Sequence, residues 1–308
     1  MISPVRPSRP LVKFCAGLSL LLILFAWFDI SSVLRKLFSI DAGYVLLAIG
    51  IFVLQFALAC ARWVFILGRQ KTKLTIRTIL SIYGVGTLAN LFLVTSIAGL
   101  SVRAALLVRR GEGLTGALAI LTAERLAAIA GLGLCGGAGL VFAFPKLQSF
   151  FLDLPYLLLA GLALCGLFIS GGAAYFLYRR FAVLRNFASR VWMVFSSPCQ
   201  ALLLIAVSAM VVLLGFAGMA ALAFGMGLSI DPVFFVSVMP AIALISALPI
   251  SVGGWGVREG AMVAGLSIFS VPAETAIALS ISYGLGGLLV ALLLGALLSL
   301  IGQETRKA

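Results

Sequence analysis

The sequence predicts an all-α polytopic membrane protein with about six transmembrane helices plus two oppositely oriented re-entrant helical hairpins in an inverted repeat. Three observations support this fold class. The 308 residues are 63% apolar and only 10% charged, and their mean hydropathy is +1.23, which exceeds what a soluble core requires. Several apolar stretches are long enough to cross a bilayer. Two similar segments, each containing glycine and charge, interrupt these stretches at corresponding points of two halves.

Basic residues orient the spans, because cytoplasmic loops carry an excess of lysine and arginine. With a cytoplasmic amino terminus, we expect spans at about 11–29, 42–66, 114–143, 155–178, 199–227 and 275–302. The first is expected to be a retained span rather than a cleaved signal peptide. Both termini are then cytoplasmic, as are the basic residues Arg6, Arg9, Lys13, Arg69, Lys71, Lys73, Arg77, Arg109, Arg110, Arg179, Arg180, Arg185, Arg190, Arg306 and Lys307.

Two further stretches are expected to enter and leave the membrane on the same side. Residues 78–108 lie between two cytoplasmic basic clusters, yet their roughly 30 residues are too few for two crossings at ~20 residues per crossing. The predicted turn of this hairpin is near residues 95–101. Residues 232–270 follow a span that leaves the cytoplasm and have no basic cluster beside them. We therefore expect the second hairpin to enter from the opposite side.

An offset of 155 residues relates the two hairpins. Residues 248–259 read LPISVGGWGVRE and residues 93–104 read LVTSIAGLSVRA, with Leu, Ser, Gly, Val and Arg in common. Broken helices at corresponding places in two halves are typical of transporters built from inverted repeats. We therefore expect a single integral membrane domain over residues 1–308, with approximate repeats at 42–144 and 199–302.

Residues 179–197 are predicted to form an interfacial amphipathic helix between the two repeats. Arg179, Asn186 and Arg190 fall on one face at helical spacing. The opposite face carries the apolar side chains of Phe181, Leu184, Ala188, Val191, Trp192 and Phe195. The alternative is that this segment continues the fourth or fifth span.

Composition excludes several classes of function. Histidine is absent, which rules out a His-ligated zinc site and a Ser-His-Asp mechanism. The five cysteines lie in or beside apolar spans without metal-ligand spacing, so we expect no disulfide, no metal site and no cofactor. The net charge of +13 is explained by the cytoplasmic basic clusters, so no nucleic-acid partner is predicted.

A group of motifs makes the chain resemble a known family. These motifs are Asn90 followed by Gly99 and Arg103, the pair Glu124-Arg125, and Pro249 followed by GGWGVRE at 253–259. Over about residues 10–302 the chain is similar to the lysylphosphatidylglycerol synthase/flippase transmembrane-domain family of flippase-like proteins. The resemblance implies a multi-pass protein of the bacterial cytoplasmic (inner) membrane that moves a lipid or lipid-linked headgroup between leaflets.

The chain departs from the family pattern in two respects. The first hairpin of the family usually carries Pro and then Gly-Gly-Asp, where this sequence has Val94 and residues Ala98, Gly99 and Leu100. Because the acidic residue is replaced, a cationic headgroup is not carried over to this chain. The soluble synthase domain of some relatives is also absent from this sequence, so we expect no aminoacyl transfer.

The charged residues inside the predicted membrane region are candidates for a substrate site. Three arginines and two glutamates leave one excess positive charge, and arginine offers paired donors to phosphate. The candidate substrate-binding residues are Asn90, Arg103, Glu124, Arg125, Arg258 and Glu259. The candidate hairpin glycines are Gly99, Gly253, Gly254 and Gly256. We expect Arg103 and Arg258 to form two halves of one midplane site.

A structural role is the alternative for these charges. Arg103 would then pair with Glu124, and Arg258 with Glu259, merely to neutralise charge. Arg62 lies near the cytoplasmic end of the second span, and we expect its side chain to snorkel toward the aqueous phase.

The predicted function is translocation of a lipid, or of a lipid-linked anionic headgroup, across the cytoplasmic membrane. No Gly-x-x-x-x-Gly-Lys nucleotide loop is present. We do not expect an enzyme. One alternative is a membrane enzyme acting on polyprenyl-phosphate sugars, although the sequence has no Asp-x-Asp pair. The other is a non-transporting partner of a lipid-synthesis enzyme. The expected partners are thus a membrane lipid and, in the last case, such an enzyme.

Overall fold

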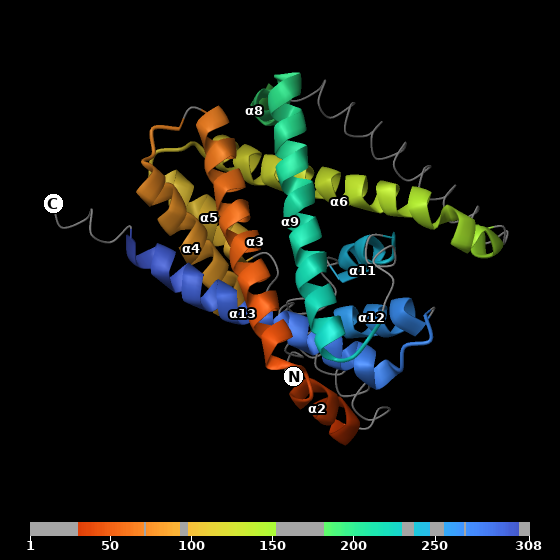
Figure 1. Ribbon diagram of the computed structural model, residues 1–308. Coiled ribbons are helices and arrows are strands. Elements are labelled where there is room, and N and C mark those ends of the chain that lie inside the picture. Colours follow the sequence, from red (N-terminus) through yellow and green to blue (C-terminus); the bar gives the residue numbers. More distant parts are fainter. Residues whose placement is uncertain are drawn as a thin grey trace, which may run out of the picture.

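The computed structural model describes residues 30–70, 72–92, 98–151, 182–229, 237–246, 256–267 and 269–301, and the regular elements within them are α-helices (Figure 1). In chain order these are α2 (Ile30–Phe38), α3 (Ala42–Arg69), α4 (Ile76–Phe92), α5 (Ala98–Arg109), α6 (Leu114–Phe151), α8 (Ala182–Phe195), α9 (Pro198–Gly225), α11 (Met239–Ser246), α12 (Val257–Ser267) and α13 (Ala273–Ile301). The spans expected at about 11–29 and 155–178 lie outside the described residues.

Four helices are long and apolar enough to cross a membrane. They are α3, α6 over Leu114–Gly139, α9, and α13 over Ala273–Leu300. Each of these stretches has 26 to 28 residues. At a rise of 1.5 Å per residue they are about 40 Å long, which exceeds the ~30 Å hydrocarbon core. They coincide with the second, third, fifth and sixth expected spans, so the protein is an all-helical, multi-pass membrane protein.

Local sequence explains where two of these helices begin. Asp41 precedes α3, and its carboxylate accepts a hydrogen bond from the Gly43 N–H at 2.8 Å. That bond satisfies one of the amide donors left unpaired at a helix start. Pro198 opens α9, where its missing N–H removes no helical hydrogen bond.

Two cores of buried apolar side chains hold the helices together. One lies among α3, α4, α5, α6, α8 and α9 and includes Trp63 and Leu107. The other lies among α2, α3, α9, α11, α12 and α13 and includes Met262 and Ile277. α3 packs against α9, α4 against α13, and α6 against α9 (Figure 1). Because α3 and α9 contribute to both cores, they join the two parts of the molecule.

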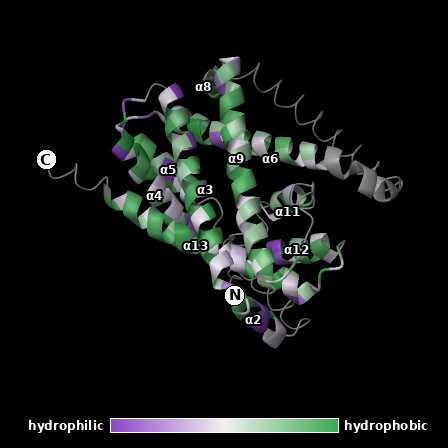
Figure 2. Ribbon diagram, in the orientation of Figure 1, coloured by the Kyte–Doolittle hydropathy of each residue, from purple (hydrophilic) through white to green (hydrophobic). Residues whose placement is uncertain are grey.

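The outer faces of the long helices are also apolar (Figure 2). Leu46 on α3, Leu202 on α9 and Leu293 on α13 are 70%, 69% and 58% exposed. Such surfaces are unfavourable in water, whereas lipid tails are as apolar as these side chains. The exterior therefore fits a hydrocarbon environment.

The segments predicted as hairpins contain pairs of shorter helices. α4 has 17 residues and packs against α5, which has 12. α11 has 8 residues and packs against α12, which has 11. Helices α5, α11 and α12 are each too short to cross a bilayer alone. Residues 93–97 and 247–255, which include parts of the two predicted breaks, lie outside the described residues.

Helix α8 lies within the segment predicted to be an interfacial helix. The Gln70 side chain, just after α3, donates to the Arg190 carbonyl at 2.5 Å, and Arg69 donates to the Met193 carbonyl at 3.2 Å. Ser196 and Ser197 separate α8 from α9, so α8 does not continue the fifth span. Its position at the membrane interface stays a prediction.

Candidate functional site

Three charged side chains from three helices meet in the first core. Arg103 of α5 donates through Nη1 to both carboxylate oxygens of Glu124 on α6, at 2.9 and 3.2 Å. Arg62 of α3 approaches Glu124 from another side, with Nη2 at 4.0 Å from Oε1, and donates through Nη1 to the Ser208 hydroxyl of α9 at 3.3 Å. All three charged residues are buried, with 6–8% of their surface exposed. We name Arg62, Arg103 and Glu124 the first cluster.

Aromatic rings and a glycine set the position of Arg103. Its guanidinium carbon lies 4.9 Å from the ring centre of Trp63 and 5.3 Å from that of Tyr83, so it makes cation–π contacts with both. Its aliphatic chain crosses α4 at Gly86, where a Cβ would overlap the Arg103 Cγ. Gly86 on the preceding helix therefore leaves the space that the Arg103 side chain occupies.

The first cluster holds two positive charges and one negative charge, so it carries one excess positive charge. Arg62 Nε and Trp63 Nε1 are buried and have no hydrogen-bond partner among the described residues. A buried donor without a partner costs free energy, and a buried unpaired charge costs more. The expectation that Arg62 snorkels toward water is wrong, because the side chain turns inward to Ser208 and Glu124.

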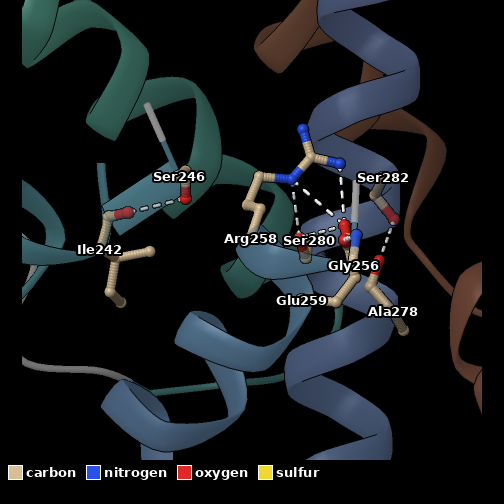
Figure 3. Close-up of polar contacts among 8 residues, drawn as sticks. All are labelled: Ile242, Ser246, Gly256, Arg258, Glu259, Ala278, Ser280 and Ser282. Carbon is tan, nitrogen blue, oxygen red and sulfur yellow. Dashed lines mark hydrogen bonds and ion pairs between the residues drawn. The ribbon is translucent and has the colours of Figure 1, made fainter. Parts of the chain in front are cut away.

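Arg258 and Glu259 form a second cluster with Ser280 (Figure 3). Arg258 donates to Glu259 Oε1 through Nε at 3.2 Å and through Nη2 at 2.9 Å. Its Nε also donates to the Ser280 hydroxyl at 2.9 Å, and that hydroxyl donates to Glu259 Oε1 at 2.8 Å. Glu259 is fully buried. We name Arg258, Glu259 and Ser280 the second cluster.

Two glycines make the second cluster possible. Gly256 precedes α12 with φ +84°, a backbone conformation that residues other than glycine rarely adopt. From there its N–H donates to Glu259 Oε2 at 2.5 Å, which is the backward arm of a capping box. The Arg258 guanidinium lies against α13 at Gly284, where a Cβ would overlap Nη2. The carboxylate of Glu259 thus receives bonds from its own helix start and from α13.

The two clusters have a related layout. Each arginine lies in a short helix that follows a predicted break, Arg103 at the middle of α5 and Arg258 in the first turn of α12, and each bonds to the next long helix. The partner of Arg103 is 21 residues ahead on α6, and the Ser280 partner of Arg258 is 22 residues ahead on α13. The carboxylates differ, because Glu124 comes from the long helix whereas Glu259 comes from the short one.

The two arginines lie in separate places. The Arg103 side chain contacts α4 at Gly86, and α4 meets α13 where a Cβ at Gly84 would lie 2.6 Å from the Gly295 carbonyl oxygen. Arg258 meets α13 at Gly284, about three helical turns before Gly295. At a rise of 1.5 Å per residue this separation is roughly 16 Å along the helix. In this conformation Arg103 and Arg258 do not converge on one anion.

The other predicted site residues have different positions. Asn90 accepts a hydrogen bond from the Gly99 N–H at 2.7 Å, so its side chain caps the start of α5. Gly99 is buried, and a Cβ there would overlap Asn90 and the Gly86 carbonyl. Arg125 is exposed and has no ion pair with any described residue. Gly253 and Gly254 lie outside the described residues.

The sequence predicts the pairing of Arg103 with Glu124 only as an alternative, and it does not predict the inward turn of Arg62 or the role of Ser280. Helix α3 extends to Arg69 rather than to about residue 66, so Arg62 lies about two helical turns from its end, deeper than the predicted span placed it. Among the described residues, no group of three His, Cys, Asp or Glu side chains is arranged to hold a metal ion.

These features define a multi-pass helical membrane protein with buried arginine–carboxylate clusters between its helices. The chain belongs to the family described as the lysylphosphatidylglycerol synthase transmembrane region, whose model matches residues 12–295. A comparison with curated proteins found no match. Membership of this family associates the protein with lipid headgroup synthesis or translocation in a membrane.

Proposed function

We propose that this protein moves a lipid with an anionic headgroup between the leaflets of the bacterial cytoplasmic membrane, without catalysing a covalent reaction. The observation that carries the proposal is the excess positive charge of the first cluster. Two buried guanidinium groups share one carboxylate, and Arg62 is paired with it only at 4.0 Å. A phosphate oxygen accepts strong, paired hydrogen bonds from arginine and would supply the missing negative charge.

The proposal includes two re-entrant hairpins of opposite orientation within an inverted repeat. The short helix pairs α4 with α5 and α11 with α12 support it, as does the related layout of the two clusters. In such repeats one structure exposes a midplane site alternately to each side of the membrane. The lipid headgroup would thus reach buried arginines from either leaflet.

The opposed hairpins predict the accessibility of two engineered cysteines. Arg110→Cys follows α5, and Ser267→Cys ends α12 close to Ser270; both positions are exposed. In a background without the natural cysteines, we expect a membrane-impermeant maleimide to label the first only from the cytoplasm and the second only from outside. Labelling of both from the same side would rule out opposed hairpins.

Transport is tested by reconstituting the purified full chain into liposomes with fluorescent lipids of different headgroup charge. We expect phosphatidylglycerol to cross faster than its zwitterionic or lysyl-bearing counterparts, because the first cluster lacks a negative charge rather than a positive one. Protein-free liposomes give the background rate. Equal rates for all headgroups would contradict the anionic preference. A rate equal to background for every lipid would contradict transport and favour an enzyme of polyprenyl-phosphate sugars or a non-transporting partner.

Arg258→Lys is expected to slow transport of phosphatidylglycerol by about tenfold while the protein stays folded. In the proposed role Arg258 contacts the phosphate as the headgroup passes the second cluster, and Glu259 orients the Arg258 guanidinium. Lysine keeps the charge but loses the planar fork. Loss of one charge-assisted hydrogen bond corresponds to a rate change of about this size. Arg77→Lys, at an exposed position in the first turn of α4, is the control and should leave the rate unchanged. Normal transport by Arg258→Lys would make Arg258 a purely structural residue.

A further inference from the structure

A small apolar cavity lies where α3, α9 and α13 meet. It has a volume of about 160 Å³, and Phe52, Gln55, Phe56 and Ala59 of α3 form one wall. Val211 of α9 and Gly287 and Val290 of α13 complete the lining. Gly287 is exposed, so the cavity reaches the outer side of the bundle. None of these residues belongs to the first or the second cluster.

The cavity lies at the centre of the two helices that join the cores. Gln55 is at the middle of α3 and Val211 is at the middle of α9, and each of these helices has 28 residues. The Gln55 side chain donates to the Val211 carbonyl at 3.0 Å, across 156 residues of sequence. That separation is close to the offset of the hairpin motifs. If a two-fold axis relates the two repeats, it passes through the point where equivalent positions touch. For inverted repeats that axis lies in the membrane plane, so this contact would be near the bilayer midplane.

The walls of this cavity favour hydrocarbon over water or a headgroup. The rings of Phe52 and Tyr283 pack edge to face at 5.5 Å, and those of Phe56 and Tyr83 pack in the same way at 5.7 Å. The Gln55 amide is held by Val211. Apolar cavities of about 150 Å³ have room for molecules the size of benzene. A segment of a lipid chain has this chemistry and this cross-section.

A cationic anchor lies on the same face of α3. The lining residues of α3 follow helical spacing from Phe52 to Ala59, and Arg62 is the next position on that stripe. Arg62 lies about two helical turns beyond Gln55, or about 10 Å along the helix. Its Nε has no hydrogen-bond partner in the described part of the chain, and only 8% of the residue is exposed. An apolar cavity with a guanidinium about 10 Å away that lacks one hydrogen-bond partner fits a lipid with a phosphate headgroup.

We infer that the cavity holds an acyl chain of a phospholipid whose phosphate binds Arg62. This inference rests on the proposed function, since it names the place where the transported lipid is held at the midplane. It assigns binding to the interface of α3, α9 and α13, outside the charged hairpin motifs. The lipid chain would lie between Phe56 and Gly287. Its phosphate would be the partner that Arg62 Nε lacks among the described residues.

The test uses the purified full chain in detergent and a phosphatidylglycerol with a diazirine in the middle of one acyl chain. We expect photo-adducts on α3 between Phe52 and Ala59. Gly287→Leu should reduce these adducts at least tenfold, because a Cβ at Gly287 points into open space and the longer side chain fills the cavity. Gly50→Leu is the matched control, since Gly50 is also exposed, on α3, and a Cβ there also meets nothing within 4 Å. Equal labelling of α3 in both variants would overturn the inference.

The anchor is tested with Arg62→Gln and two probes. Labelling by the phosphatidylglycerol probe should fall about tenfold, whereas labelling by a diacylglycerol with the same diazirine should not change. An equal fall for both probes would show that Arg62 only shapes the protein and would overturn its anchoring role. Labelling of the cavity by a diazirine-bearing polyprenyl phosphate but not by phosphatidylglycerol would overturn the acyl-chain assignment.

The outcome is separable from that of the transport assay. Adducts in the cavity without transport in liposomes would uphold the binding site and reject the proposed function. Transport with adducts only elsewhere would uphold the function and reject the site.

Discussion

Glu259→Ala is expected to lower the free energy of unfolding by about 3–5 kcal/mol, because it leaves the Arg258 charge buried without its carboxylate partner. Glu259 is fully buried and accepts bonds from Arg258, Ser280 and the Gly256 N–H. Its removal therefore breaks the start of α12 and the contact of α12 with α13 together. The side chain of Arg258 is itself only 15% exposed, so water compensates little of this loss.

Reversible unfolding in mixed detergent micelles measures this effect. Glu274→Ala is the matched control, since Glu274 lies in the first turn of α13 and has no hydrogen bond or ion pair with the described residues. Only its favourable interaction with the helix start is lost, which is worth about 0.3–1 kcal/mol. A loss below about 1 kcal/mol for Glu259→Ala would mean that Arg258 is hydrated or paired elsewhere.

Glu124→Ala is expected to have a comparable cost, about 3–5 kcal/mol, because it leaves two buried arginines facing each other without a counter-charge. Arg62 and Arg103 both approach the Glu124 carboxylate, at 4.0 and 2.9 Å. Removing one arginine should then relieve the repulsion. The double variant Arg62→Gln/Glu124→Ala is therefore expected to be more stable than Glu124→Ala alone, with a coupling energy of about 0.5–3 kcal/mol.

Arg125→Ala is the control for this series, since Arg125 is the neighbour of Glu124 on α6 but is exposed. Its effect should stay within about 0.5 kcal/mol. If Arg62→Gln fails to improve the stability of Glu124→Ala, then Arg62 does not belong to the charge balance of the first cluster. Lipid binding at Arg62 would then also lose its electrostatic basis.

Several features followed from local sequence because their causes are local. A run of apolar residues either reaches the thickness of a bilayer or does not, and the four long helices coincide with predicted spans for this reason. The turn predicted near residues 95–101 is too long, because α5 already begins at Ala98, and the break predicted within 248–259 ends before α12 begins at Val257. The motifs around Arg103 and Arg258 also indicated the family that the chain proved to match.

The pairing of the charges could not be derived in this way. Residues such as Glu124 and Arg125 are neighbours in the chain, yet they point about 100° apart on a helix, and one is buried while the other is exposed. In α3 and α9 apolar residues occur on all sides, so their sequence does not reveal which face packs inward. The inward turn of Arg62 depends on that choice.

The sequence by itself therefore determined the membrane class, four of the spans, the family, and the presence of costly charges near the predicted breaks. The tertiary structure alone decided that Arg62 shares Glu124 with Arg103, that Ser280 completes the second cluster, and that Gln55 at the middle of α3 meets Val211 at the middle of α9. The physical reason is that apolar length and helix breaks are properties of a segment. Partners of buried charges depend on the rotation and crossing of helices far apart in the chain.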